Sequence, residues 1–203
     1  MAESAPEGSS ARDWRQRVFA KRGLLLALPA VALALGGRPN ARSIAAGLPI
    51  ALAGEALRCW AVGYSGVTTR SDDVTAPALV TAGPYAYVRN PLYLGNFITA
   101  LGFSIAFTGA LPPGRRLVLA GFGLGSMAAL YAAIVPLEEA YLRKTFGAEF
   151  DEYAGRVPRL VPRTTPSAPA RGTYDASVIA SAESRTFLTF GAMLLALAVK
   201  ARS

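Results

Sequence analysis

The stretch LVLAGFGLGSMAALYAAIVPL, residues 117–137, decides the fold class of this 203-residue chain, because it contains no charged side chain. The hydrocarbon core of a bilayer is about 30 Å thick, and about 20 mostly apolar residues in a helix cross it. Further apolar stretches lie on both sides of it, at residues 23–37, 43–64, 92–110 and 176–203. The sequence therefore predicts an all-α integral membrane protein with about five transmembrane helices.

The polar segments between these stretches suggest how the chain is divided. We expect a basic interfacial amino-terminal segment at 1–22, a membrane core at 23–163 that ends in an amphipathic cap at 138–163, a linker at 164–175 and an apolar helix at 176–203. The first stretch is short, and the last has an apolar core of only residues 187–199. If the last helix lies on the membrane surface, the number of spans falls to four.

The composition excludes several classes of protein. The chain has no histidine, which removes the Ser-His-Asp triad, histidine-bound zinc or haem, and a histidine acid or base. We expect no metal site. The formal charge of +8 accompanies a positive mean hydropathy of +0.33, so it indicates a lipid surface rather than a nucleic-acid partner. The oligomeric state cannot be read from these features.

The distribution of lysine and arginine predicts the orientation. With five alternating spans, the side of the membrane that holds the amino terminus carries 14 of these residues outside the helices, against 6 on the other side. Cytoplasmic segments are the ones enriched in lysine and arginine. We therefore expect the amino terminus, the 65–91 segment and the cap to be cytoplasmic, and any chemistry to take place there.

Two polar clusters border the apolar stretches on that side. Residues 79–95 read LVTAGPYAYVRNPLYLG, in which Gly83-Pro84 and Asn90-Pro91 mark turns and three tyrosines lie next to the membrane. The second cluster begins with Glu138-Glu139, and a helix over 137–156 would place Leu142, Phe146, Phe150 and Tyr153 on one face. This pattern predicts an amphipathic lid lying on the membrane. The tyrosines alone would also suit an aromatic belt at the interface.

Two features inside the predicted spans have structural explanations. Glu55 and Arg58 are three residues apart on one helix face, so they can pair, or Arg58 can lie near a polar pocket. Gly121, Gly125 and Ala129 form a stripe of small residues that permits close helix packing, within the chain or between chains.

The two clusters, in this order and separated by two spans, resemble the isoprenylcysteine carboxyl methyltransferase and phospholipid N-methyltransferase family of integral membrane enzymes. The similarity covers about residues 55–162 and includes Leu57-Arg58 and Trp60-Ala61 in the second span. It implies S-adenosylmethionine as the cofactor and a lipophilic acceptor that enters from the bilayer. The positions that match the cofactor-binding residues of the family are Pro77, Ala78, Leu79, Val80, Tyr85, Asn90, Pro91, Leu92, Tyr93, Glu138 and Glu139.

The chain departs from the family pattern at two positions. Asn90 stands where histidine is typical, and an amide can donate a hydrogen bond but cannot act as a base. Ile134 stands where prenylcysteine methyltransferases have an arginine that contacts the acceptor. Arg58 and Arg156 are the candidates for the acceptor side.

The sequence thus predicts S-adenosylmethionine-dependent methyl transfer to a lipid or isoprenoid-linked acceptor at the cytoplasmic membrane face. It does not identify a catalytic residue or the nucleophile. The alternative is a non-catalytic membrane scaffold, or a module that binds lipid or a partner and retains the fold. A transporter is disfavoured, because no chain of ionisable residues crosses the predicted bilayer region.

Overall fold

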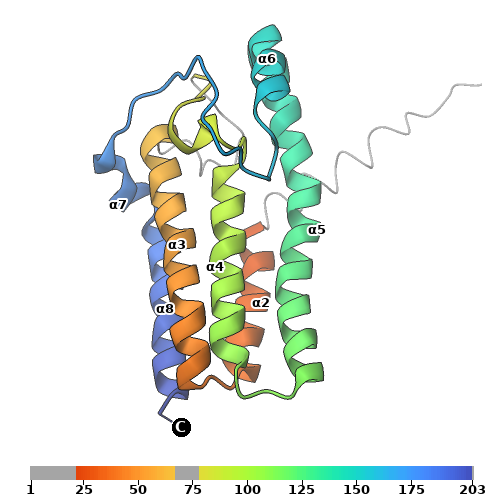
Figure 1. Cartoon of the computed structure of the whole chain (residues 1–203), viewed down its shortest axis with the longest axis vertical. Coiled ribbons are helices and arrows are strands. Elements are labelled where there is room, and N and C mark those ends of the chain that lie inside the picture. The colour runs from red at the N-terminus through yellow and green to blue at the C-terminus, as the bar shows by residue number, and fades with distance from the viewer. Residues whose placement is uncertain (1–21, 67–77, 203) are drawn as a thin grey trace, which may run out of the picture.

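The computed structural model describes residues 22–66 and 78–202, and over these residues it contains helices and no strands. The long helices stand side by side in one bundle (Figure 1). They are α2 (Arg22–Gly36), α3 (Ala41–Ser65), α4 (Pro91–Thr108), α5 (Pro113–Phe146) and α8 (Ser184–Lys200). The shorter elements are η2 (Gly83–Ala86), α6 (Ala148–Arg156), η3 (Ala176–Val178) and α7 (Ile179–Ala182). The all-α prediction is confirmed.

The predicted number of spans is met only in part. In the described residues α3, α4 and α5 are long and apolar enough to cross a membrane. A fourth span requires the carboxyl-terminal pair 176–182 and α8 to act as one, across a bend of 66°. The apolar part of α2 covers only Ala27–Gly36, which is short of the length that a bilayer needs. The basic segment predicted at residues 1–22 lies almost entirely outside the described residues.

Glycine residues bring α3 and α4 into close contact. A Cβ atom on Gly54 of α3 would lie 2.7 Å from the carbonyl oxygen of Gly95, and a Cβ atom on Gly102 of α4 would lie 2.7 Å from the carbonyl oxygen of Gly47. Only residues without a side chain allow backbones to approach this closely.

The stripe of small residues on α5 does not serve the same purpose within the chain. Gly121 and Gly125 face open space as far as the described residues extend, and Ala129 is exposed. Among the described residues this stripe therefore makes no close contact within the chain, and packing between chains stays a prediction. The close contact lies one helix pair away, between α3 and α4, where glycine is present on both partners and the two backbones can meet.

The helix α5 is longer than the predicted span. It continues past Pro136 through the acidic pair to Phe146, so the first turns of the cap are continuous with the membrane helix. It ends at Gly147, whose φ of 54° favours glycine, and α6 begins at the next residue. The acidic pair thus lies on a rigid helix rather than on a loop.

The linker, residues 164–175, is attached to the bundle by backbone hydrogen bonds. The amide of Ser167 donates to the carbonyl of Ala86 at 2.9 Å, and the amides of Thr81 and Ala82 donate to the carbonyl of Arg171 at 2.9 and 3.0 Å. The linker therefore crosses the end of the bundle beside η2 (Figure 1). We call this end, which also carries the cap, the cap end.

Candidate functional site at the cap end

The two clusters found in the sequence meet at the cap end. The hydroxyl of Tyr93, in the first turn of α4, donates to Glu138 Oε1 at 2.6 Å. The amide nitrogen of Asn90 is 3.4 Å from Glu139 Oε1. Pro91 starts α4 at its first position, where a missing N–H costs nothing. The turn and the acidic pair, about 45 residues apart in sequence, therefore form one site.

Glu139 is held by two arginines. Arg89 Nε donates to Glu139 Oε1 at 3.1 Å, and Arg159 donates from Nε at 3.1 Å and from Nη2 at 2.5 Å. The carboxylate is buried, whereas the Arg159 side chain is 49% exposed. The hydrogen bond to Glu139 raises the pKa of the Arg159 guanidinium. Because Glu139 already has charged donors on both oxygens, it mainly fastens the cap to the bundle.

Arg89 extends this attachment to the end of α6. Its Nη1 donates to the carbonyls of Ala154 and Val157 at 2.7 and 2.8 Å, in the last turn of that helix. A cation at a helix carboxyl terminus satisfies carbonyls that lack a partner in the helix. The backbone amide of Arg89 also donates to the carbonyl of Pro158 at 2.9 Å.

Glu138 has a different environment from its neighbour. It is half-buried, receives the Tyr93 hydroxyl, and lies near an aromatic group on α4 and α5. The rings of Tyr93 and Tyr131 are 4.4 Å apart, and those of Phe97 and Tyr131 are 5.9 Å apart. The geometry thus separates the two carboxylates, with one held by arginines and the other beside aromatic rings.

The apolar face of the cap packs on the protein. Phe150, Tyr153 and Val157 are buried against Leu79, with Leu142 and Phe146 beside them. The predicted amphipathic face is therefore present, but these side chains cover the segment before η2. The lid predicted to lie on the membrane is instead docked on its own chain.

Tyrosine hydroxyls tie the cap to the turn below it. Tyr153 donates to the carbonyl of Tyr85 at 2.9 Å, and burial raises the pKa of Tyr153. Burial also raises the pKa of Tyr85 to about 12, although a hydrogen bond with Ser65 acts in the opposite direction. Both phenols therefore stay protonated at neutral pH.

The other positions predicted to bind the cofactor are distributed around this site. Leu79 and Pro91 are buried, and Val80 and Leu92 are half-buried. Ala78 is exposed, and Pro77 lies outside the described residues. Asn90 occupies the residue before α4 without capping it, since its side chain is directed to Glu139 and to the carbonyl of Arg159 at 3.1 Å.

Arg58 is buried in the bundle and has a partner that sequence reasoning missed. Its Nη2 donates to both oxygens of Glu183 at 2.8 Å, and its Nη1 donates to Asn96 Oδ1 at 2.5 Å. Glu55, the predicted partner, is 3.9 Å away. Glu183 lies at the bend between α7 and α8, so the ion pair fixes the carboxyl-terminal helix to α3. An acidic residue between two apolar segments was the signal that could have revealed it.

Asn96 continues the polar contacts of Arg58 toward the site. Its Nδ2 donates to the hydroxyl of Tyr131 at 2.7 Å. A hydrogen-bond network therefore runs from Glu183 through Arg58 and Asn96 to Tyr131. It joins the bend before α8 to α3, α4 and α5. This network positions the ring of Tyr131 beside Tyr93.

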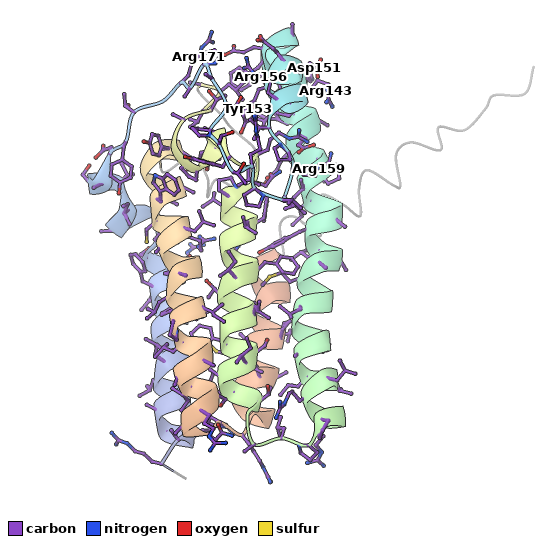
Figure 2. The ribbon with its side chains drawn as sticks, viewed as in Figure 1. Arg143, Asp151, Tyr153, Arg156, Arg159 and Arg171 are labelled. Atoms are coloured by element: carbon purple, nitrogen blue, oxygen red, sulfur yellow. The ribbon has the colours of Figure 1, made fainter. Side chains whose placement is uncertain are left out.

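Arg156, the second candidate on the acceptor side, is half-buried and pairs within the cap. Its Nη1 bonds Glu152 at 2.9 Å, one turn earlier on α6. Figure 2 shows Arg156 among Arg143 and Asp151 at the tip of the cap, whereas Arg159 lies lower, toward α5. Arg159 is therefore the cap arginine that reaches the acidic pair.

A small apolar cavity opens beside the site. It has a volume of about 180 Å³ and lies between α3, η2, α4 and the end of the cap. Its lining residues are Leu57, Trp60, Pro84, Tyr87, Val88, Leu94 and Pro162. Such a surface suits a hydrocarbon rather than a polar ligand.

Comparison with known proteins is consistent with this arrangement. Residues 43–149, slightly more than half of the chain, match the family described as phospholipid methyltransferase. The chain belongs to this family of membrane methyltransferases. The matched region contains the turn, the acidic pair and Arg58, whereas Arg159 and Glu183 lie beyond it.

Individual relatives are similar over a shorter part. The chain is 39% identical to the nickel-cobalt-cadmium resistance protein NccN of Alcaligenes xylosoxydans xylosoxydans over 85 residues, 42% of this chain and 36% of that protein. It is 37% identical to the protein-S-isoprenylcysteine O-methyltransferase of Schizosaccharomyces pombe over 89 residues, 41% of this chain and 33% of that protein. It is 33% identical to the protein-S-isoprenylcysteine O-methyltransferase B of Arabidopsis thaliana over 84 residues, 41% of this chain and 39% of that protein. The similarity thus spans little more than a third of each relative, and no solved structure matches.

Proposed function

We propose that this protein is an S-adenosylmethionine-dependent methyltransferase that acts on a lipid or isoprenoid-linked acceptor at the cytoplasmic face of the membrane. The observation that carries the proposal is the meeting of the Asn90 to Tyr93 turn with Glu138 and Glu139, in a chain of the phospholipid methyltransferase family. The excess of lysine and arginine on the side of the amino terminus supports the cytoplasmic orientation.

The residues at the cap end fit the cofactor. A methionine moiety carries an ammonium, a carboxylate and, in this cofactor, a sulfonium. Glu138, a half-buried carboxylate beside the Tyr93 hydroxyl, would accept hydrogen bonds from the ammonium. The aromatic faces of Tyr93 and Tyr131 suit a cation such as a sulfonium.

The contribution of the protein to the chemistry is positioning and exclusion of water. When bound, the cofactor supplies an electrophilic methyl group on a positively charged sulfur. Alignment of donor and acceptor in a site closed by the cap can supply much of the acceleration without a covalent intermediate. A thiolate or carboxylate acceptor needs no base. For an amine acceptor, we propose Glu138 as the group that takes the proton, because its carboxylate lies at the site.

The apolar cavity beside Trp60 and Tyr87 supports a lipophilic acceptor. Neither Arg58 nor Arg156 is placed to bind an acceptor carboxylate, since each has a glutamate partner of its own. Ile134 is buried and brings no charge to the site. A lipid with an amine or a neutral headgroup therefore fits better than the carboxylate of a prenylated cysteine.

A non-catalytic scaffold is the second candidate. It is favoured by the saturation of Glu139 with arginine donors and by Asn90, which cannot transfer a proton.

A methyl-transfer assay distinguishes the two candidates. The full chain in lipid nanodiscs would receive methyl-labelled S-adenosylmethionine together with phosphatidylethanolamine or a prenylcysteine analogue. We expect label in the lipid fraction, most with the amine lipid, and a loss of at least about tenfold in the Glu138→Gln variant. Arg115→Gln, at the opposite end of the bundle, should keep full activity. Absence of transfer to either acceptor by folded protein would favour the scaffold.

A further inference from the structure

Among the described residues, the charged side chains at the end of the bundle opposite the cap are all basic. The segments 37–43, 108–117 and 199–202 contain six basic residues and no aspartate or glutamate. These are Arg38, Arg42, Arg115, Arg116, Lys200 and Arg202. The cap end differs, because several of its arginines are paired with carboxylates, as Arg143 is with Asp151 and Arg156 with Glu152. We call the opposite end the basic end.

A cavity of about 500 Å³ lies at the basic end between α3, α4 and α5. It exists because α5 packs tightly only through its cap-side half, where all its buried residues, from Leu130 to Glu139, are found. Toward the basic end α5 leaves open the face of α4 that carries Leu101 and Ile105. This cavity belongs neither to the cap end nor to the apolar cavity beside Trp60.

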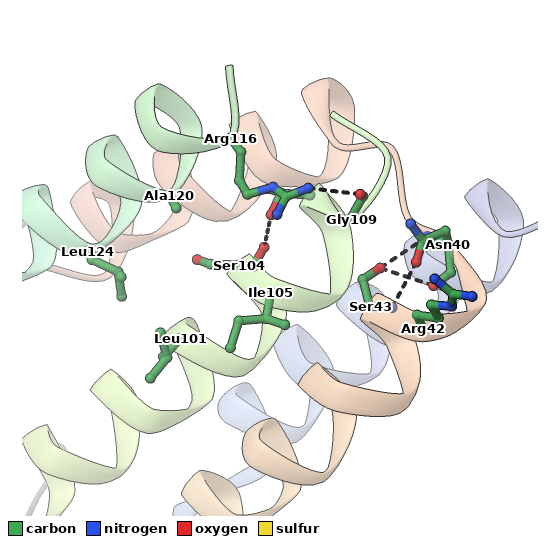
Figure 3. Close-up of a pocket in the computed structure, with 11 residues that line it drawn as sticks. Asn40, Arg42, Ser43, Leu101, Ser104, Ile105, Gly109, Arg116, Ala120 and Leu124 are labelled. Carbon is green, nitrogen blue, oxygen red and sulfur yellow. Dashed lines mark hydrogen bonds between the residues drawn. The ribbon is translucent and has the colours of Figure 1, made fainter. Parts of the chain in front are cut away.

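The interior of this cavity is apolar. Leu101 and Ile105 of α4 and Ala120 and Leu124 of α5 line it from opposing helices (Figure 3). On each helix the two residues are four apart, so the apolar surface extends about 6 Å, one helical turn, along the bundle axis. Such a groove parallel to membrane-spanning helices suits an acyl chain.

The rim of the cavity is cationic and polar. Arg42 at the start of α3 and Arg116 at the start of α5 both line it and are exposed. Arg116 Nη2 donates to the carbonyl of Gly109 at 2.9 Å (Figure 3). It also donates to the carbonyl of Leu111 at 3.4 Å, so the guanidinium is fixed beside the α4–α5 turn. A guanidinium has five N–H donors, so the remaining nitrogens can bind an anion. Among the described residues neither arginine has a carboxylate partner.

We propose that this cavity binds one phospholipid with an anionic headgroup. The phosphate lies between Arg42 and Arg116, and one acyl chain follows Leu101, Ile105 and Leu124 toward the middle of the bundle. Charge complementarity selects the anionic headgroup, and the apolar wall selects a lipid over a soluble anion, which would gain nothing from it. The site does not depend on the proposed methyl transfer.

The test uses the full chain in a neutral detergent. Phosphatidylglycerol, phosphatidylcholine and soluble glycerol phosphate would be added at equal concentration, with bound lipid read by native mass spectrometry and stability by the midpoint of thermal unfolding. We expect phosphatidylglycerol alone to stay bound and to raise the midpoint. An equal effect of glycerol phosphate, or of phosphatidylcholine, would overturn the proposal.

Two double variants distinguish a specific binding site from a diffuse basic surface. The double variant Arg42→Gln, Arg116→Gln should weaken phosphatidylglycerol binding by about tenfold or more. The matched variant Arg38→Gln, Arg115→Gln removes the same charge from the same end, outside the cavity, and should bind nearly as the wild type does. Equal weakening in both would show a diffuse basic surface and contradict the proposal.

A third variant tests the apolar part. Ala120→Trp fills the groove and leaves both arginines in place, so it should also lose phosphatidylglycerol. Unchanged binding in this variant would contradict the placement of the acyl chain, and an unchanged unfolding midpoint without lipid would show that the variant is folded.

Discussion

Two arginine–glutamate ion pairs in this protein differ in how deeply they are buried. Arg58 and Glu183 lie inside the bundle, with side chains 9% and 1% exposed. Arg159 and Glu139 lie at the cap end, with side chains 49% and 6% exposed. In each pair one residue comes from the family-matched region and the other from beyond it. The comparison shows that the segment after residue 149 is joined to the membrane core by ion pairs of different depth. Depth should decide how much each pair contributes to stability.

The inner pair should give the largest effect. Glu183→Ala leaves the guanidinium of Arg58 buried without its main carboxylate, which costs about 3–5 kcal/mol in comparable cases. The free energy of unfolding, measured in detergent with a chemical denaturant, should fall by that amount. The double variant Arg58→Met, Glu183→Ala removes both charges and should recover a large part of the loss. A double variant as unstable as the single one would show that Arg58 is not the reason for the loss.

The outer pair should contribute less. Arg159→Gln removes the Nε and Nη2 donors of Arg159 from Glu139, which keeps Arg89, and the loss of stability should be about 1–2 kcal/mol. Residues 157–163 should also become easier to cleave, because Arg159 attaches this part of the cap to α5. Limited proteolysis of the folded chain measures this, with Arg115→Gln, an exposed arginine at the basic end, as the control. A loss equal to that of Glu183→Ala would contradict the role of depth.

The surface pair of the cap should give the smallest effect. Arg143 and Asp151 are both more than half exposed, although their atoms are only 2.6 Å apart. Exposed pairs contribute about 0–1 kcal/mol, since water competes with the partner. Asp151→Asn should therefore change the unfolding free energy by less than about 0.5 kcal/mol. A larger change would mean that the distance between partners matters more than their burial.

Much of the fold could be predicted from the sequence, because apolar runs and turn residues are local signals. The runs around 43–64 and 92–110 predicted α3 and α4 closely. The turn before Pro91 and the acidic pair were expected on the same side of the membrane, and the structure brings them into contact. Contacts between segments far apart in the chain were harder to predict from the sequence. The linker is held by hydrogen bonds to the backbone carbonyls of Ala86 and Arg171. Such bonds cannot be predicted from residue types, because every residue has a carbonyl.

Other differences from the structure arose because one sequence pattern is compatible with more than one arrangement. Gly121 and Gly125 are four residues apart, as in a packing stripe, but Gly47 and Gly54 on α3, which are seven residues or about two turns apart, make the close contact in the structure. The sequence could not distinguish the roles of Glu138 and Glu139, because the two residues are identical and adjacent. Only the fold shows that Arg89 and Arg159 converge on Glu139 and that Tyr93 meets Glu138.

Calorimetric titration of the detergent-purified full chain with S-adenosylmethionine tests the central claim most directly, with Glu138→Gln and Glu139→Gln as matched variants. The wild type should bind, Glu138→Gln should weaken binding by at least about tenfold through loss of a charge-assisted hydrogen bond, and Glu139→Gln should lower the unfolding midpoint with a smaller effect on affinity. Binding that is lost in Glu139→Gln and retained in Glu138→Gln would contradict the division of roles, and no binding by the folded wild type would contradict the cofactor site itself.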